Sequence, residues 1–195
     1  MNRSGKMWLG DPVQYKHYDQ LQKLMQCMLE DYAEWKLKYD IDSKCVDAAS
    51  RYEMPPENAN GFMALPIIDA RKVQQPWADG WERTVAQAYE CPGMIDMCIN
   101  FIRPGKMLPV HHDGHVWSWI RGSMGKHVEG FTTSFGIHIP DPTNQCLVFD
   151  GESKVWNTGE FRTFNGEFTQ HYMKNLGSDW RITGVMEIEK EYYVL

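Results

Sequence analysis

The second half of the chain, from Met94 onward, consists of short apolar runs of strand length that are separated by turn residues. Dipeptides such as Pro104-Gly105 and Asn165-Gly166 mark the turns. Many short strands with regular turn signals are typical of a β-sandwich or barrel. We therefore expect strands at Met94–Ile102, Met107–His111, Gly130–Ile139, Gln145–Asp150, Lys154–Trp156, Glu160–Phe164, Thr169–Met173 and Arg181–Glu189.

The first half has a different pattern, in which apolar residues recur at spacings of three and four between Tyr18 and Trp35. This spacing is one face of an amphipathic helix, which we expect to follow an N-cap at Asp11 and to end at about Lys38. A second helix is expected over Asp79–Cys91, and a short strand before it over Ala64–Ile68.

Helices followed by a series of short strands predict a mainly β (α+β) fold. We expect a double-stranded β-helix or jelly-roll core, cupin-like, with the N-terminal helices packed against one sheet. A chain of 195 residues is most simply one domain. Within it, residues 1–93 would form the helical buttress and first strands, and residues 94–195 the β-helix core.

Composition and charge exclude several classes of protein. The net charge of −6 gives no electrostatic signal for binding nucleic acid. The five cysteines include no C-x-x-C pair, which favours a reduced, cytoplasmic protein. No apolar signal-peptide core precedes Trp8, and no run approaches the ~20 apolar residues of a membrane span. A small-molecule substrate is expected, while the oligomeric state cannot be predicted.

A histidine two residues before an acid supplies two ligands of a 2-His-1-carboxylate site, the site of many non-haem iron enzymes. In a helix, residues two apart point in nearly opposite directions, whereas in extended chain they share a face. The sequence holds three such pairs: His17/Asp19, His111/Asp113 and His127/Glu129. The first pair falls in the expected helix and the last lacks a rigid strand, so we favour the middle pair.

The third ligand must come from elsewhere in the chain, and His171 is the best candidate because a turn and an expected strand surround it. The alternatives are His112, His115, His127 and His138, of which the last fits a hydrogen-bonded strand histidine better. Arg181 begins the last apolar strand, where burial without an anionic partner would be costly. A guanidinium can clamp a carboxylate through two parallel hydrogen bonds. An exposed edge arginine or a structural ion pair is the alternative.

Residues 114–129 follow the favoured ligand pair directly, and glycines within them allow movement. A loop of this length in a compact domain is often an active-site lid. Trp117 and Trp119 would offer apolar walls to a substrate, and Arg121 an anchor for a carboxylate. The alternative is that both tryptophans belong to the hydrophobic core.

Several motifs follow one another in a fixed order between Gly105 and Glu189. They are Leu108-Pro-Val-His-His-Asp, Ser134-Phe-Gly-Ile-His-Ile-Pro140, Glu152-Ser-Lys-Val-Trp156 with the Thr158-Gly159-Glu160 turn, and Phe164-Asn-Gly-Glu-Phe-Thr-Gln-His171. With the interval from His171 to Arg181, this segment resembles the aspartyl/asparaginyl β-hydroxylase family. Its members are Fe(II)- and 2-oxoglutarate-dependent oxygenases and include some L-proline hydroxylases.

The resemblance implies a double-stranded β-helix that binds Fe(II) through His111, Asp113 and His171. It implies that Arg181 grips the distal carboxylate of 2-oxoglutarate, and that Ser134 is a polar contact to this cosubstrate. The implied reaction uses O₂ to hydroxylate an unactivated C–H bond and releases succinate and CO₂. We expect the substrate to be an amino acid or an amino-acid-like carboxylate.

Three other functions are consistent with the same residues. One is aspartyl or asparaginyl hydroxylation on a peptide or protein. Another is a non-catalytic cupin-like binding module, which predicts that His111, Asp113 and His171 do not converge. The third is a zinc or manganese hydrolase or isomerase, which would have no need for an inward-facing Arg181.

Overall fold

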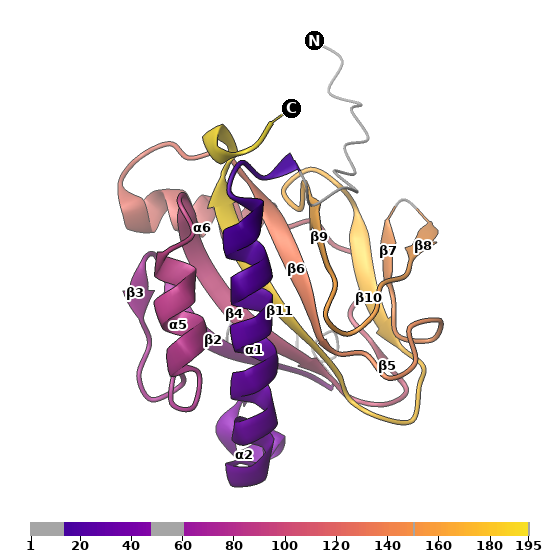
Figure 1. Cartoon of the computed structure of the whole chain (residues 1–195). Coiled ribbons are helices and arrows are strands. Elements are labelled where there is room, and N and C mark those ends of the chain that lie inside the picture. Colours follow the sequence, from indigo (N-terminus) through magenta and orange to yellow (C-terminus); the bar gives the residue numbers. More distant parts are fainter. Residues whose placement is uncertain (1–13, 48–60, 150, 195) are drawn as a thin grey trace.

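Two antiparallel sheets form the body of the structure, a computed structural model that describes residues 14–47, 61–149 and 151–194 (Figure 1). The larger sheet contains, in spatial order, β1 (Val46–Asp47), β2 (Phe62–Asp69), β4 (Met94–Ile102), β11 (Arg181–Glu189), β6 (Gly130–His138) and β9 (Phe161–Phe164), with β3 (Lys72–Val73) paired to β2. The smaller sheet contains β5 (Lys106–Met107), β10 (His171–Asn175), β7 (Leu147–Phe149) and β8 (Glu152–Lys154).

The two sheets enclose one of the hydrophobic clusters between them. Phe62, Ile102 and Phe164 come from the larger sheet, and Leu147 and Met173 come from the smaller one. The chain passes from β6 in the larger sheet to β7 and β8 in the smaller one, then returns through β9 and crosses again to β10. This is a double-stranded β-helix, or jelly roll, as the strand pattern predicted.

The N-terminal helices cover the outer face of the larger sheet (Figure 1). The apolar stripe of α1 (Tyr18–Lys38) packs on β4, β6 and β11, with Leu24, Met28 and Trp35 fully buried. The helix ends at the predicted residue but begins at Tyr18, and the expected N-cap at Asp11 lies outside the described residues. The other helices are α2 (Ile41–Lys44), α5 (Glu82–Tyr89), α6 (Gly114–Met124) and the 3₁₀ helix η2 (Lys190–Tyr192).

Helix α6 corrects the prediction that residues 114–129 form a loop. Its apolar residues Trp117 and Ile120, three apart, are buried against Ile95 and Val128. Gly125, with φ of 63°, ends the helix in the left-handed conformation that glycine adopts readily. The glycines that were interpreted as allowing movement therefore have other roles: Gly114 and Gly122 lie within α6, and Gly125 ends it.

The predicted strand Met107–His111 is also shorter than expected. Strand β5 ends at Met107, and Pro109 lacks the backbone N–H that a continuing ladder would need. Pairing with β10 resumes as a single β-bridge at His111. Strands β4 and β11 have the predicted boundaries, and the other predicted strands differ by a few residues at their ends. The two-residue strands β1 and β3 were not predicted.

Among the described helices, none combines the length and the apolar character needed to cross a lipid bilayer.

Candidate metal centre

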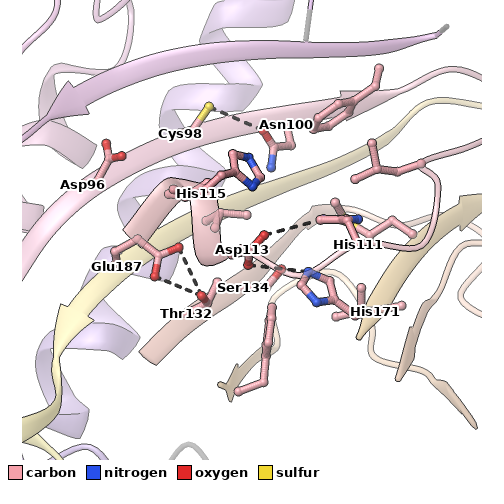
Figure 2. Close-up of a pocket in the computed structure, with 17 residues that line it drawn as sticks. Asp96, Cys98, Asn100, His111, Asp113, His115, Thr132, Ser134, His171 and Glu187 are labelled. Atoms are coloured by element: carbon pink, nitrogen blue, oxygen red, sulfur yellow. Dashed lines mark hydrogen bonds and ion pairs between the residues drawn. The ribbon is translucent and has the colours of Figure 1, made fainter. Parts of the chain in front are cut away.

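His111, Asp113 and His171 converge in the wall of the pocket between the sheets (Figure 2). One donor atom from each residue lies within 4.8 Å of the other two. His111 Nε2 is 3.6 Å from Asp113 Oδ1, and His171 Nε2 is 3.5 Å from Asp113 Oδ2. Two imidazoles and one carboxylate on one side of a space form the donor set of a 2-His-1-carboxylate metal site.

Backbone hydrogen bonds fix both histidines relative to each other. His111 N donates to His171 O at 2.9 Å, and His171 N donates to His111 O at 2.8 Å. Each ring has its Nδ1 close to a carbonyl two residues earlier, Pro109 O at 2.7 Å and Thr169 O at 2.9 Å. Donation from Nδ1–H to these carbonyls leaves both Nε2 lone pairs directed at the shared space.

Asp113 is held by the turn that precedes β10. Its backbone N donates to Gly166 O at 2.7 Å, and the residue also occupies the N-cap of α6. A methyl group at Gly166 would lie 2.2 Å from Asp113 Oδ2 and 2.7 Å from Thr132 Oγ1. Any side chain at residue 166 would therefore force the Asp113 carboxylate or the Thr132 hydroxyl to shift.

The environment favours the uncharged form of His111. Burial lowers the pKa of its imidazole below the usual 6.5, and the neighbouring His171 lowers it further. A neutral imidazole is the form that binds a metal ion. The site is therefore prepared to accept a cation at neutral pH.

Arg181 is completely buried at the far end of β11, behind Met173, which lines the pocket. Its Nε donates to Gln145 O at 3.3 Å, and its Nη1 lies 3.3 Å from Met173 Sδ and 3.4 Å from Thr183 Oγ1. Its Nη2 is buried without a hydrogen-bond partner.

Within the described part of the chain, no carboxylate forms an ion pair with Arg181, and burial lowers the pKa of its guanidinium to about 10. The two alternatives from the sequence, an exposed edge arginine and a structural ion pair, do not describe it. A buried guanidinium with an unused N–H can bind an anion, and the described residues supply none.

Ser134 lies on β6 of the larger sheet and lines the pocket near Asp113 and His171 (Figure 2). Ser134 is buried, and its paired residue on β11 is Val185, which also lines the pocket. A hydroxyl at this point can hydrogen-bond a polar ligand.

The three residues expected to bind substrate do not reach the described pocket wall. Trp117 is buried in the cluster beneath α6, which is the core alternative, and the side chain of Trp119 is 42% exposed. Arg121 is committed to Glu167, with Nη1–Oε1 and Nη2–Oε2 distances of 2.8 Å each, and its Nε donates to Val128 O. These residues belong to helix α6 and are not part of a lid loop over the pocket.

The remaining histidines do not join the cluster. His112 is exposed, and its ring accepts a hydrogen bond from Gly114 N. His115 lies at the start of α6, on the pocket rim. His127 is exposed beside Glu129, and His138 hydrogen-bonds Asp179, as expected of a strand histidine.

Polar residues of the strands that face the pocket were missed by the sequence analysis. Asp96, Cys98 and Asn100 alternate along β4, and Val185 and Glu187 alternate along β11, all on the inner face. Charged residues inside otherwise apolar, fully buried strands are rare without a partner, and this was the available signal. The pocket lining as a whole is Phe62, Asp96, Cys98, Asn100, Leu108, His111, Asp113, His115, Val116, Thr132, Ser134, Leu147, Phe164, His171, Met173, Val185 and Glu187.

Comparisons with known proteins find similarity in solved structures alone: no protein-family model matches the chain, and no curated protein does. A sugar phosphate isomerase of the cupin superfamily from Silicibacter pomeroyi DSS-3 aligns with 68% of this chain and 62% of its own, at 13% identity and a TM-score of 0.41. A cupin 2 conserved barrel domain protein from Salinispora arenicola CNS-205 aligns over 68% and 80%, at 12% and 0.40. The DMSP lyase DddQ from Ruegeria pomeroyi DSS-3 aligns over 72% and 53%, at 8% and 0.44. We draw no conclusion about activity, ligand or partner from similarities at this level.

Proposed function

We propose that this protein is an Fe(II)- and 2-oxoglutarate-dependent dioxygenase that hydroxylates an unactivated C–H bond of a small substrate. The observation that carries the proposal is the pairing of two features in one barrel. Two histidines and one carboxylate converge at the pocket. Behind the same pocket lies a buried guanidinium that has no anionic partner among residues 14–47, 61–149 and 151–194. The ordered motifs that resemble the aspartyl/asparaginyl β-hydroxylase family support the same conclusion.

The residues present fit the metal and the cosubstrate. His111, Asp113 and His171 would hold Fe(II), because two imidazoles and one carboxylate are the donor set that such an ion takes in non-haem iron enzymes. The unused Nη2 of Arg181 would donate to a carboxylate of 2-oxoglutarate, and Ser134 would add a hydroxyl contact. When bound, iron, 2-oxoglutarate and O₂ supply the oxidising chemistry and yield succinate and CO₂.

The chain itself positions the reactants and excludes water. The two Nδ1–H···O=C hydrogen bonds orient the imidazoles. Gly166, in the turn before β10, accepts a hydrogen bond from Asp113 N and so helps to hold the carboxylate beside both rings. Apolar residues from both sheets, including Leu147 and Phe164, line part of the pocket and limit access of solvent.

The competing functions make different demands on these residues. A binding module without metal does not require the donor atoms of His111, Asp113 and His171 to lie within 4.8 Å of one another. A zinc or manganese hydrolase has no use for an uncompensated guanidinium at Arg181. We therefore favour the oxygenase, with a free amino acid or a similar small carboxylate as substrate and a peptide as the alternative.

The test is an anaerobic titration of the full chain with Fe(II) and 2-oxoglutarate, followed by the weak visible charge-transfer absorption of the chelate. The wild type should develop this band, and Asp113→Ala and His171→Ala should not. His112→Ala is the matched control, because this neighbouring histidine is exposed and outside the cluster. Absence of the band in the wild type, or its persistence in both ligand variants, would refute the proposal.

A further inference from the structure

Strand β11 carries opposite charges at the two ends of its inner face. Arg181 and Glu187 are separated by an even number of residues, so their side chains project to the same side of the sheet. At the rise of an extended chain they are about 20 Å apart along the strand. Arg181 is fully buried and Glu187 is 5% exposed, so both charged groups are shielded from water.

Glu187 lies beside one hydroxyl donor and near other acids. Its two oxygens receive the hydroxyl of Thr132, at 2.9 and 3.1 Å. Its Cα partner on β4 is Asp96, which is 6% exposed and faces the same pocket. Burial raises the pKa of Glu187 well above its usual value, and the nearby Asp113 and Asp96 raise it further.

No lysine, arginine or histidine forms an ion pair with Glu187 in the described ranges of the chain. Glu189, two residues later on the same strand, shows the difference. Its carboxylate forms ion pairs with Arg71 at 2.8 Å and with Lys126 at 3.1 Å. The strand therefore supplies cations to one buried carboxylate and leaves its neighbour without one among the described residues. The charged form of Glu187 is then costly, so the group either keeps a proton or binds a ligand that brings the missing positive charge.

Thr132 connects this carboxylate with the metal centre. A methyl at Gly166 would lie within 2.7 Å of Thr132 Oγ1 and 2.2 Å of Asp113 Oδ2, so these two oxygens are near neighbours. Figure 2 shows Glu187, Thr132 and Asp113 in sequence along one wall of the pocket. A group bound at Glu187 is thus in the same space as a group held at the metal, and on the side away from Arg181.

We propose that Glu187, together with Asp96, binds a cationic group of the substrate, an ammonium or a guanidinium. This inference rests on the proposed oxygenase function and specifies the substrate class of that site. Arg181 then binds the anionic cosubstrate at one end of β11, and Glu187 binds the cationic end of the substrate at the other. The C–H bond to be hydroxylated lies between the cationic group and the metal.

The inference can be tested by binding, without turnover. Ligand-observed NMR of the full chain compares n-butylammonium with 1-butanol, a neutral probe of nearly the same size, with and without anaerobic Fe(II) and 2-oxoglutarate. We expect the wild type to bind the ammonium at least tenfold more tightly than the alcohol. Glu187→Gln should abolish this preference, and Asp96→Asn should reduce it.

Glu189→Gln is the matched control, because it removes a buried carboxylate of the same strand that already has cationic partners, and it should retain the preference. Equal binding of the two probes to the wild type overturns the inference, whether or not the variants fold. A preference that survives Glu187→Gln in a folded variant overturns it as well. The proposed function is judged separately by the chelate band, so a preference for the ammonium without that band supports the cation site and refutes the oxygenase.

Discussion

His111 and His171 exchange both of their backbone hydrogen bonds, and their ring centroids lie 4.4 Å apart. The two candidate ligands come from segments far apart in the chain, yet they form one antiparallel bridge. Because each ring also has its Nδ1 next to a backbone carbonyl, the position of each Nε2 is fixed by main-chain geometry. The site should therefore be preorganised before any metal binds.

The first prediction concerns the glycine behind Asp113. Gly166→Ala would place a methyl 2.2 Å from Asp113 Oδ2, so the carboxylate would have to shift from its position beside the histidines. Displacing a ligand through its support typically costs about 10- to 100-fold in metal affinity. We expect a loss of this size in Fe(II) affinity, measured by anaerobic titration.

Gly122→Ala is the matched control for this substitution. Gly122 lies within α6, and a methyl there would meet no atom within 4 Å. Alanine is the better helix former, so the variant should be more stable by about 0.5–1 kcal/mol, with metal affinity unchanged. If Gly166→Ala binds Fe(II) as tightly as Gly122→Ala does, the close approach does not determine the site.

The second prediction separates stability from cosubstrate binding at Arg181. Arg181→Met keeps most of the side-chain volume and removes a buried charge whose Nη2 has no partner. The free energy of unfolding of the ligand-free protein should be unchanged or higher. Affinity for 2-oxoglutarate should fall at least ~30-fold, because loss of one partner of a buried charge pair costs about 2–5 kcal/mol.

Isothermal titration with 2-oxoglutarate and thermal unfolding provide the two measurements for Arg181→Met. Arg103→Met serves as the control, since this arginine is exposed and pairs with Asp42 and the ring of Trp180. A variant at position 181 that is strongly destabilised but binds 2-oxoglutarate normally would make Arg181 a structural residue.

The sequence was sufficient for the fold because strand pattern and turn residues agree over the second half of the chain. Strands β4 and β11 have the predicted ends, since both are long, continuously buried and bounded by turn residues. The convergence of His111, Asp113 and His171 was also predicted, although His111 and Asp113 were expected in extended chain. Strand β5 instead ends at Met107, and Asp113 adopts φ of −84° and ψ of 20° at the N-cap of α6. The bridge between His111 and His171 brings the second histidine opposite the first.

The sequence was misleading where glycine has more than one role. Helix α6 was interpreted as a lid because of its glycines, although Trp117 and Ile120 already have helical spacing. Its tryptophans and Arg121 were consequently assigned to a substrate that they do not face. Glu187 was overlooked because the sequence does not show which residues surround it. That its carboxylate lacks a cationic partner among the described residues can be seen only in the folded structure.

The third prediction concerns the ion pair between Arg121 and Glu167, which joins α6 to the turn that contains Gly166. Both hydrogen bonds are 2.8 Å long, and Arg121 also donates to Val128 O. Arg121→Met and Glu167→Gln should each destabilise the protein by about 1–3 kcal/mol, the range for hydrogen bonds to charged groups. Denaturant unfolding of both single variants and the double variant measures their coupling.

If the two residues act through each other, the double variant should lose clearly less free energy of unfolding than the two single variants lose in sum. The Fe(II) affinity of both single variants should fall as well, because the turn with Gly166 positions Asp113. Additive effects on stability together with normal metal affinity would show that the pair does not support the site.

The last prediction is a pH dependence of stability that belongs to Glu187. The folded protein raises the pKa of this carboxyl well above 4.5, so the folded state keeps a proton that the unfolded chain has already lost. Stability from this group is complete below about pH 4.5 and is lost as the pH rises through the folded-state pKa. In metal-free protein, the melting temperature of Glu187→Gln should therefore exceed that of the wild type by an amount that grows with pH.

Saturating n-butylammonium should reduce this difference in melting temperature, because a cation beside the carboxylate favours its charged form. A difference that does not change with pH would mean that Glu187 does not experience the buried, acidic surroundings on which the cation site depends.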